Sequence, residues 1–144
     1  MNEIREILLV EDNPNDIELT LRSLRKHNLA DRVFVARDGA EALDYVFGTG
    51  RYSGRSAQGL PKVIFLDLKL PKLDGMGVLR KLKSDERTQG IPVVLLTSSL
   101  EEQHIVKSYQ LAVNSYVIKP VEFDNFARAL SESGLDWLIV KRDG

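Results

Sequence analysis

The sequence predicts an α/β fold, a doubly wound (βα)5 domain in which helices cover both faces of a five-stranded parallel sheet. Short apolar runs alternate along the chain with longer segments whose apolar residues recur at helical spacing. The runs are apolar at almost every position, which is typical of strands buried on both faces. The chain has 144 residues, the length of one domain with its own core.

The elements follow this alternation in order. The strands are predicted at the short apolar runs: residues 7–10, 33–36, 62–67, 93–96 and 116–118. The helices are predicted where apolar residues recur at helical spacing: residues 14–27, from 38 to about 47, 75–83, 101–111 and 122–133. Each helix follows a strand, so the order is that of repeated βα units.

The helices differ in how clearly the sequence marks them. The first has an N-cap candidate in Asn13 and Pro14 at its first position, and the second has a capping-box-like start at Asp38 and Glu41. The fourth has only a thin apolar face: Ile105, Val106 and Tyr109. Three phenylalanines are expected in the core: Phe34, Phe47 and Phe65.

Composition excludes several classes of protein. The net charge is −1 and no basic domain or helix-turn-helix is added to the fold, so nucleic acid is not an expected partner. The chain has no cysteine, which excludes disulfides, thiolate nucleophiles and cysteine-based zinc sites. It shows neither a secretory signal nor an apolar run long enough to span a membrane, so we expect a cytoplasmic protein.

Two segments depart from the βα rhythm. Residues 48–59 are rich in Gly and Ser and are expected to form a surface excursion at the N-terminal edge of the sheet. Residues 134–144 form an apolar C-terminal extension that contains Trp137, and we expect it to support a homodimer. We therefore expect a single domain over residues 1–144, with a core of about 6–133 and no output domain.

Polar groups stand at the ends of four predicted strands. They are an acid pair, a single acid, a hydroxyl and a lysine: Glu11 and Asp12, Asp67, Thr97, and Lys119. In an open parallel sheet the carboxyl ends of the strands share one edge, where ligands bind. Bare carboxylates placed together repel one another, and Mg²⁺ removes that conflict because it prefers oxygen ligands. The sequence therefore predicts a magnesium site at this edge, with Mn²⁺ or Ca²⁺ as substitutes.

This set of groups suits the transfer of a phosphoryl group. An aspartate carboxylate can attack phosphorus and hold an acyl phosphate. Catalysis of that transfer depends on positioning and on neutralising the charge of three equatorial oxygens. We expect Mg²⁺, the Lys119 ammonium and the Thr97 hydroxyl to contact one oxygen each. A cis bond between Lys119 and Pro120 would direct the lysine toward the site.

The ordered set resembles the receiver domain of two-component response regulators over about residues 7–130. It consists of Glu11–Asp12, Asp67 with Pro71 and Gly75, Thr97–Ser98, and Lys119–Pro120. The resemblance implies a flavodoxin-like sheet with strand order 2-1-3-4-5. It also implies Asp67 as phosphoacceptor of a sensor histidine kinase, and Thr97 with Tyr116 as a switch pair. The implied metal ligands are Asp12 directly, Glu11 mainly through water, Asp67, and the backbone carbonyl of Lys69.

Within that family, the excursion at 48–59 and the tail with Trp137 are similar to those of stand-alone regulators of bacterial and cyanobacterial phytochromes. This resemblance implies a light-regulated histidine kinase as the phosphodonor. The chain is then a signalling protein rather than an enzyme with turnover. We further expect Lys69 and Ser99, which flank the pocket, to set the lifetime of the phosphorylated state.

Other functions remain open at this point. A phosphatase with an aspartate nucleophile would place a general acid two residues after Asp67, where this chain has Lys69. A phosphorylation-independent adaptor would be expected to lack the aspartate, the lysine or the threonine, and none is lost. A flavin-binding protein of this fold is disfavoured because the loop after the first strand is acidic and would repel phosphate.

Overall fold

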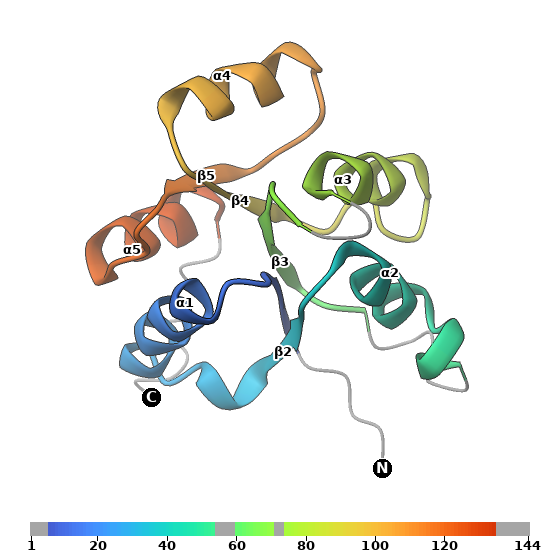
Figure 1. Ribbon diagram of the computed structural model, residues 1–144, viewed down its shortest axis with the longest axis horizontal. Coiled ribbons are helices and arrows are strands. Elements are labelled where there is room, and N and C mark those ends of the chain that lie inside the picture. The colour runs from blue at the N-terminus through green and yellow to red at the C-terminus, as the bar shows by residue number, and fades with distance from the viewer. Residues whose placement is uncertain (1–5, 54–59, 71–73, 135–144) are drawn as a thin grey trace.

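The sheet has five parallel strands in the order β2-β1-β3-β4-β5 (Figure 1). The computed structural model describes residues 6–53, 60–70 and 74–134. The strands match the predicted runs to within one residue at either end: β1 (Ile7–Val10), β2 (Val33–Ala36), β3 (Val63–Asp67), β4 (Val93–Thr97) and β5 (Ser115–Ile118). Each pair of neighbours is parallel, so the predicted doubly wound, flavodoxin-like fold is confirmed.

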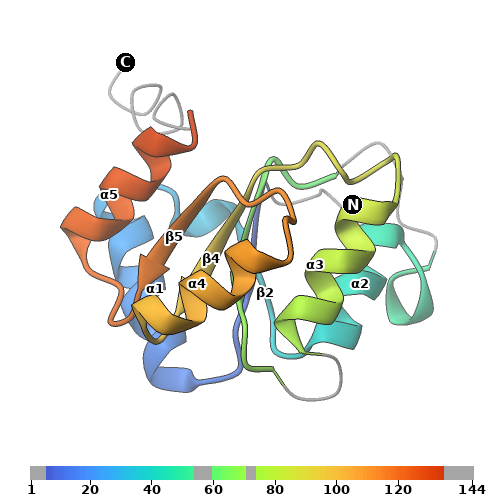
Figure 2. The same cartoon turned by 90° about the horizontal axis from the view of Figure 1, so that it is seen from above.

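Five α-helices cover the sheet, with α1 and α5 on one face and α2, α3 and α4 on the other (Figures 1 and 2). Their bounds are α1 (Pro14–Lys26), α2 (Gly39–Phe47), α3 (Gly75–Ser84), α4 (Leu100–Ser108) and α5 (Phe123–Glu132). Two 3-10 turns, η1 (Ala30–Arg32) and η2 (Gly50–Tyr52), complete the described elements. Among the described residues, none of the helices has the length and apolarity that a membrane span requires.

Polar caps start the helices at the edge of the sheet where the strands end. Asn13 accepts hydrogen bonds from the backbone N–H groups of Asn15 and Asp16, as predicted. Asp38 caps α2 by accepting from the N–H of Glu41. These caps point the positive ends of the helix dipoles toward that edge, where negative charge is stabilised.

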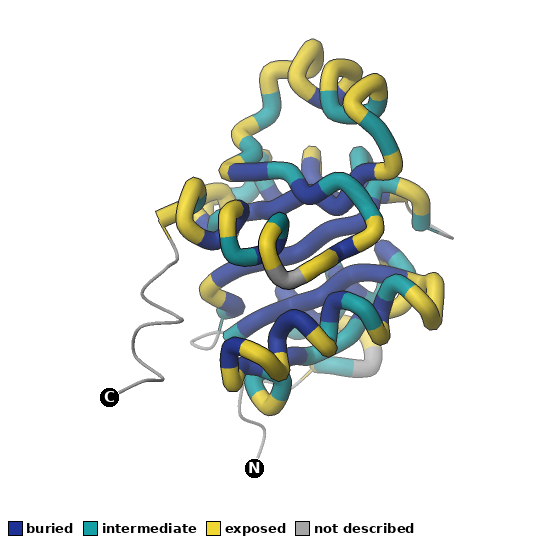
Figure 3. Tube along the Cα trace, turned by 90° about the vertical axis from the view of Figure 1, so that its left-hand side faces the viewer, coloured by how far each residue is buried: buried dark blue, intermediate teal, exposed yellow. Residues whose placement is uncertain are grey.

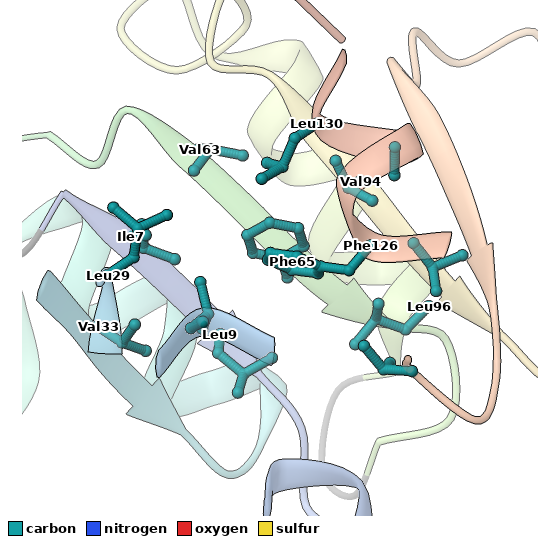
Figure 4. Close-up of a cluster of buried hydrophobic side chains, with 14 of the residues drawn as sticks. Ile7, Leu9, Leu29, Val33, Val63, Phe65, Val94, Leu96, Phe126 and Leu130 are labelled. Carbon is teal, nitrogen blue, oxygen red and sulfur yellow. The ribbon is translucent and has the colours of Figure 1, made fainter. Parts of the chain in front are cut away.

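The core consists of two layers, one on each face of the sheet. Alternate residues of β1 enter different layers, with Ile7 and Leu9 on the α1 and α5 side. Phe65 is fully buried there and stacks on Phe126 at 5.1 Å between ring centroids (Figure 4). Its predicted core position is confirmed.

The other two phenylalanines predicted in the core are only partly buried. Phe34 and Phe47 pack against the second layer from its margin. Phe34 lies on edge strand β2, where it stacks on Tyr45 at 3.9 Å between ring centroids. An edge strand and the end of a helix leave one side of a ring open to solvent, which accounts for the difference.

Helix α4 is shorter and more exposed than predicted. It ends at Ser108 rather than at Leu111, and Gln110 has a positive φ of 57° that breaks the helix. Val106 is buried, whereas Ile105 and Tyr109 are each 51% exposed. Figure 3 shows this helix at the top as a mostly exposed element. The predicted apolar face was therefore wrong for two of its three residues, because α4 presents only one of them to the sheet.

The excursion predicted at 48–59 begins by folding back on the domain. The ring of Tyr52 lies edge-on to Phe34 and Tyr45, and its hydroxyl donates to Glu41 at 2.7 Å. Glu41 is in the first turn of α2. The start of the excursion therefore lies beside α2 and is not confined to the N-terminal edge of the sheet. Residues 54–59 and the tail with Trp137 lie outside the described residues, so the rest of the excursion and the homodimer stay predictions.

Candidate functional site

Strand register brings the predicted polar groups to one edge. Val10 pairs with Leu66, the residue before Asp67, so Glu11 and Asp67 stand at the same level. Thr97 ends β4 and pairs with Ile118, the residue before Lys119. The backbone N–H of Lys119 donates to the Thr97 carbonyl at 2.8 Å, which fixes the lysine beside that strand end.

Three carboxylates form a compact group at this edge. One oxygen each from Glu11, Asp12 and Asp67 lies within 4.8 Å of the others. Glu11 and Asp67 are buried, and Asp12 is exposed. A hard divalent cation fits this donor set, since it prefers oxygen ligands and would neutralise the mutual repulsion of the acids.

The pKa of Glu11 reflects both its burial and the neighbouring acid. Burial raises the pKa of Glu11, and its hydrogen bond with Asp67 raises it further, to about 7. Lys119 acts in the opposite direction without cancelling the shift. A divalent cation beside Glu11 would favour the ionised carboxylate and oppose this shift of its pKa.

Lys119 is the centre of a second set of contacts. Its Nζ lies 2.9 Å from Glu11 Oε1, 3.0 Å from Asp16 Oδ2 and 3.2 Å from Asp67 Oδ2. Burial alone would lower the pKa of Lys119, but hydrogen bonds to Glu11 and Asp16 and the charge of Asp67 raise it. The ammonium therefore stays charged, and the Lys119–Pro120 peptide bond is cis, as expected.

Asp16 was missed as a site residue. An acid in the first turn of α1 is ordinarily explained by the helix dipole. In the structure its carboxylate also accepts a hydrogen bond from Lys119. No sequence signal separates Asp16 from an ordinary acid in the first turn of a helix, because α1 begins at Pro14 and the helix dipole already accounts for an acid there.

Thr97 and Tyr116 lie on the same side of the sheet. Tyr116 pairs with Leu95, which is two residues before Thr97, so both side chains face the α4 layer. The Thr97 hydroxyl is buried and has no hydrogen-bond partner within the described part of the chain. Tyr116 is half-buried, which raises the pKa of its hydroxyl, and Lys107 lies 5.4 Å from its ring centroid.

Lys69 pairs with an acid of α4 rather than with the carboxylates at the strand ends. Its backbone N–H donates to Asp67 Oδ1 at 3.3 Å, and its Nζ lies 3.3 Å from Glu102 Oε2. Glu102 also accepts from Ser98, through the backbone N–H at 2.9 Å and through the hydroxyl at 2.8 Å. Burial would raise the pKa of Glu102, but donation from Ser98 and Lys69 lowers it.

Ser99 serves as the N-cap of α4. Its hydroxyl accepts from the backbone N–H of Glu102 at 3.2 Å. The expected effect of Ser99 on the lifetime of the phosphorylated state stays a prediction. Sequence reasoning placed no role on Glu102, since an acid near a helix start is usually explained by the cap alone.

These residues surround one open cavity of about 380 Å³, which is lined by Asp12, Asn13, Asp16, Asp67, Lys69, Ser98, Glu102 and Lys119. Gly75, at the start of α3, packs closely against the backbone that includes Asp67 and Leu68. A Cβ atom at this position would lie 2.3 Å from the Asp67 carbonyl oxygen and 2.5 Å from Leu68 Cα. The cavity thus combines the buried carboxylate of Asp67, the ammonium of Lys119 held by ion pairs, and further carboxylate oxygens.

Comparison with known proteins identifies a family. A family model described as the response regulator receiver domain matches residues 7–131. The chain is 40% identical over 132 residues to the probable methanogenesis regulatory protein FilR2 of Methanothrix harundinacea, covering 92% of this chain and 83% of that protein. It is 37% identical over 118 residues to response regulator Rcp1 of Synechocystis sp., covering 82% and 78%.

Solved structures agree with these relatives. The bacteriophytochrome response regulator AtBRR superposes with a TM-score of 0.84 at 56% identity, covering 93% of this chain and 95% of that one. The Mn²⁺-bound form of Rcp1 superposes with a TM-score of 0.71 at 34% identity, covering 92% and 93%. Matches of this extent take in the sheet and the helices that surround the cavity.

Proposed function

Because the chain belongs to the response regulator receiver family, we propose that it takes a phosphoryl group from a partner sensor histidine kinase onto Asp67 and signals through protein contacts. The observation that carries this proposal is the surroundings of Asp67. Its carboxylate is buried, lies 3.2 Å from the Lys119 ammonium and forms a cluster with the carboxylates of Glu11 and Asp12.

The transfer forms one bond and breaks one. A carboxylate oxygen of Asp67 attacks phosphorus, and the P–N bond to the imidazole of a kinase phosphohistidine breaks, leaving that nitrogen to take up a proton. Lys119 holds positive charge beside the reacting carboxylate throughout. The unpartnered Thr97 hydroxyl is available to donate to a phosphoryl oxygen once the group arrives.

Receiver domains bind divalent metal, and the acids here fit one. Glu11, Asp12 and Asp67 would hold it, with the Lys69 carbonyl as the further ligand that the sequence resemblance implies. We propose Mg²⁺ as the natural ion, with Mn²⁺ or Ca²⁺ as substitutes; the relative Rcp1 has a Mn²⁺-bound form. When bound, the ion neutralises charge on the phosphoryl oxygens in the transition state.

We propose a phytochrome-type kinase as the donor. The chain is similar to AtBRR, a bacteriophytochrome response regulator, and to Rcp1 of a cyanobacterium. The FilR2 relative is named for methanogenesis regulation, so the resemblance by itself does not fix the signal. Phosphotransfer from a panel of purified histidine kinases, each in light and dark, tests this choice. A donor that is indifferent to light would contradict it.

The residues around Asp67 disfavour the phosphatase alternative. Lys69 occupies the position that a general acid would need, and it pairs with Glu102. The adaptor alternative is disfavoured because every group that phosphorylation requires is present in the cavity or at its edge. We therefore propose that the chain modifies only its own Asp67 and does not turn over a substrate.

One experiment separates the three functions. The protein is incubated with Mg²⁺ and acetyl phosphate, and the intact mass is followed before and after alkali treatment. We expect an acid-stable, alkali-labile gain of one phosphoryl group that is absent from Asp67→Asn. Steady hydrolysis of phosphate esters would indicate a phosphatase, and an unmodified wild type would indicate an adaptor.

A further inference from the structure

Glu102 gathers three hydrogen-bond or charged donors from two different strand-end loops. Ser98, after β4, donates through its backbone N–H and its hydroxyl to the two carboxylate oxygens. Lys69, after β3, approaches Oε2 at 3.3 Å. The Glu102 side chain is only 19% exposed, so these donors largely replace its water.

Helix capping does not account for this arrangement. In a capping box the glutamate at this position would accept from the N–H of the N-cap residue, here Ser99. The Glu102 carboxylate instead reaches one residue further back, to Ser98, and across the cavity mouth to Lys69. The second contact adds nothing to a helix start, and it ties α4 to the loop that follows Asp67.

The same donors line the cavity that contains Asp67 and Lys119. A phosphoryl group on Asp67 would bring about two negative charges and three acceptor oxygens into that cavity. It would attract the Lys69 ammonium and the Ser98 donors, and it would repel the Glu102 carboxylate. Two anions would then compete for one set of donors.

We propose that Glu102 is an internal anion that occupies Lys69 and Ser98 in the unphosphorylated state and gives them up to the phosphoryl group. This inference rests on the proposed function, since it requires an anion on Asp67. Glu102 is a positioning residue: it does not touch the reacting atoms, and it acts by holding Lys69 and Ser98 in a second arrangement.

The exchange has a direct route to the surface. Glu102 is in the first turn of α4, two residues after Leu100, which is 59% exposed. Leu100 and Tyr116 line a separate open cavity of about 300 Å³ between α4, β5 and α5. Loss of the Ser98 and Lys69 contacts unties the Glu102 side chain from the loops that follow β3 and β4, while the Ser99 cap remains. Any partner that prefers this untied state strengthens phosphoryl binding by the same factor.

Beryllofluoride with Mg²⁺ supplies a stable phosphoryl mimic for the test. Its affinity is measured by titration for wild type, Glu102→Gln and Glu101→Gln. The glutamine keeps an acceptor for the Ser98 N–H but loses the charge that holds Lys69. We expect Glu102→Gln to bind the mimic about three- to tenfold more tightly. Glu101→Gln, an exposed acid in the same helical turn, is expected to match wild type.

A Lys69→Met background shows whether Glu102 acts through Lys69. In that background we expect the ratio of mimic affinities between Glu102→Gln and its parent to fall toward one. In wild type we expect the amide resonance of Ser98 to shift when the mimic binds. Equal affinities for wild type and Glu102→Gln, or equal gains in Glu101→Gln, overturn the inference. Failure of wild type to bind the mimic, or binding unaffected by Asp67→Asn, would instead overturn the proposed function.

Discussion

The Lys119 ammonium lies 3.0 Å from the Asp16 carboxylate, 0.2 Å closer than it lies to Asp67, which is at 3.2 Å. Lys119 is thus shared between the reacting carboxylate and an acid on α1 that belongs to no strand end. Because Lys119 is shared, it attracts Asp67 and an incoming phosphoryl group less strongly than an ammonium without other partners would. Asp16 also adds negative charge to a cavity that must admit an anionic phosphodonor. Asp16 is therefore expected to slow the reaction.

The substitution Asp16→Asn tests this relationship. We expect phosphorylation by acetyl phosphate to become about two- to fivefold faster, because Lys119 is released and the cavity repels the donor less. The rate is measured by intact mass at early times under saturating Mg²⁺. Glu18→Gln is the matched control, since Glu18 is exposed on the same helix and pairs with Arg25. A slower Asp16→Asn protein would mean that Asp16 orients Lys119 instead of competing for it.

Glu11 gives the metal-free protein a defined pH dependence. Its pKa is about 7 in the fold and close to 4.5 in the unfolded chain, so between these values the folded state binds more protons. The free energy of unfolding contributed by Glu11 is present below about pH 4.5 and is lost as the pH rises through 7, by up to about 3 kcal/mol. Urea denaturation in EDTA at pH 5 to 8 measures it.

Glu11→Gln separates this contribution from other titrations. We expect the variant to be more stable than wild type at pH 8 in EDTA, and the difference to disappear toward pH 5. Saturating Mg²⁺ is expected to stabilise wild type more than the variant, because the ion compensates a charge that the glutamine side chain does not carry. A difference that is independent of pH would contradict the raised pKa of Glu11.

Lys119 is also expected to stabilise the fold. In Lys119→Met three carboxylates lose their shared cation in a mostly buried site, and removing one partner of such a pair costs several kcal/mol. We expect a free energy of unfolding lower by about 2–4 kcal/mol in EDTA. Mg²⁺ should restore part of the loss.

Lys81→Met provides the comparison for Lys119, because Lys81 is an exposed lysine on α3. Its change is expected to stay within about 0.5 kcal/mol. If both variants lose the same stability, the loss comes from the methionine and not from the unpaired acids.

The polar residues at the strand ends could be predicted from the sequence to lie together, because the geometry of a parallel sheet determines where they go. All five strands are parallel, so residues that follow them must share one edge, and Glu11, Asp67, Thr97 and Lys119 do. Asp16 and Glu102 could not be found by that rule. Each lies in the first turn of a helix, where the helix dipole already explains an acid, and each meets its lysine only through tertiary packing.

The exposed face of α4 shows the other limit of sequence reasoning. Ile105 and Tyr109 fall on the spacing of a buried stripe, but the rotation of a short helix over the margin of a sheet depends on its neighbours. The Tyr109 ring is half exposed and lies 5.0 Å from the guanidinium of Arg80 on α3, a neighbour that the periodicity of α4 does not reveal. Periodicity predicts that a helix forms; it does not decide which of two adjacent apolar positions turns inward.

Gly75 packs against the backbone of Asp67, so a substitution at this position is expected to affect both stability and metal binding. In Gly75→Ala the new Cβ would lie 2.3 Å from the Asp67 carbonyl oxygen, so the backbone after β3 must move. We expect a loss of about 1–3 kcal/mol in the free energy of unfolding and weaker Mg²⁺ binding, since Asp67 moves with that backbone. Gly90→Ala is the control, because a Cβ there meets nothing within 4 Å, and it should be neutral. Unchanged Mg²⁺ affinity in Gly75→Ala would show that the position of Asp67 does not depend on this close approach.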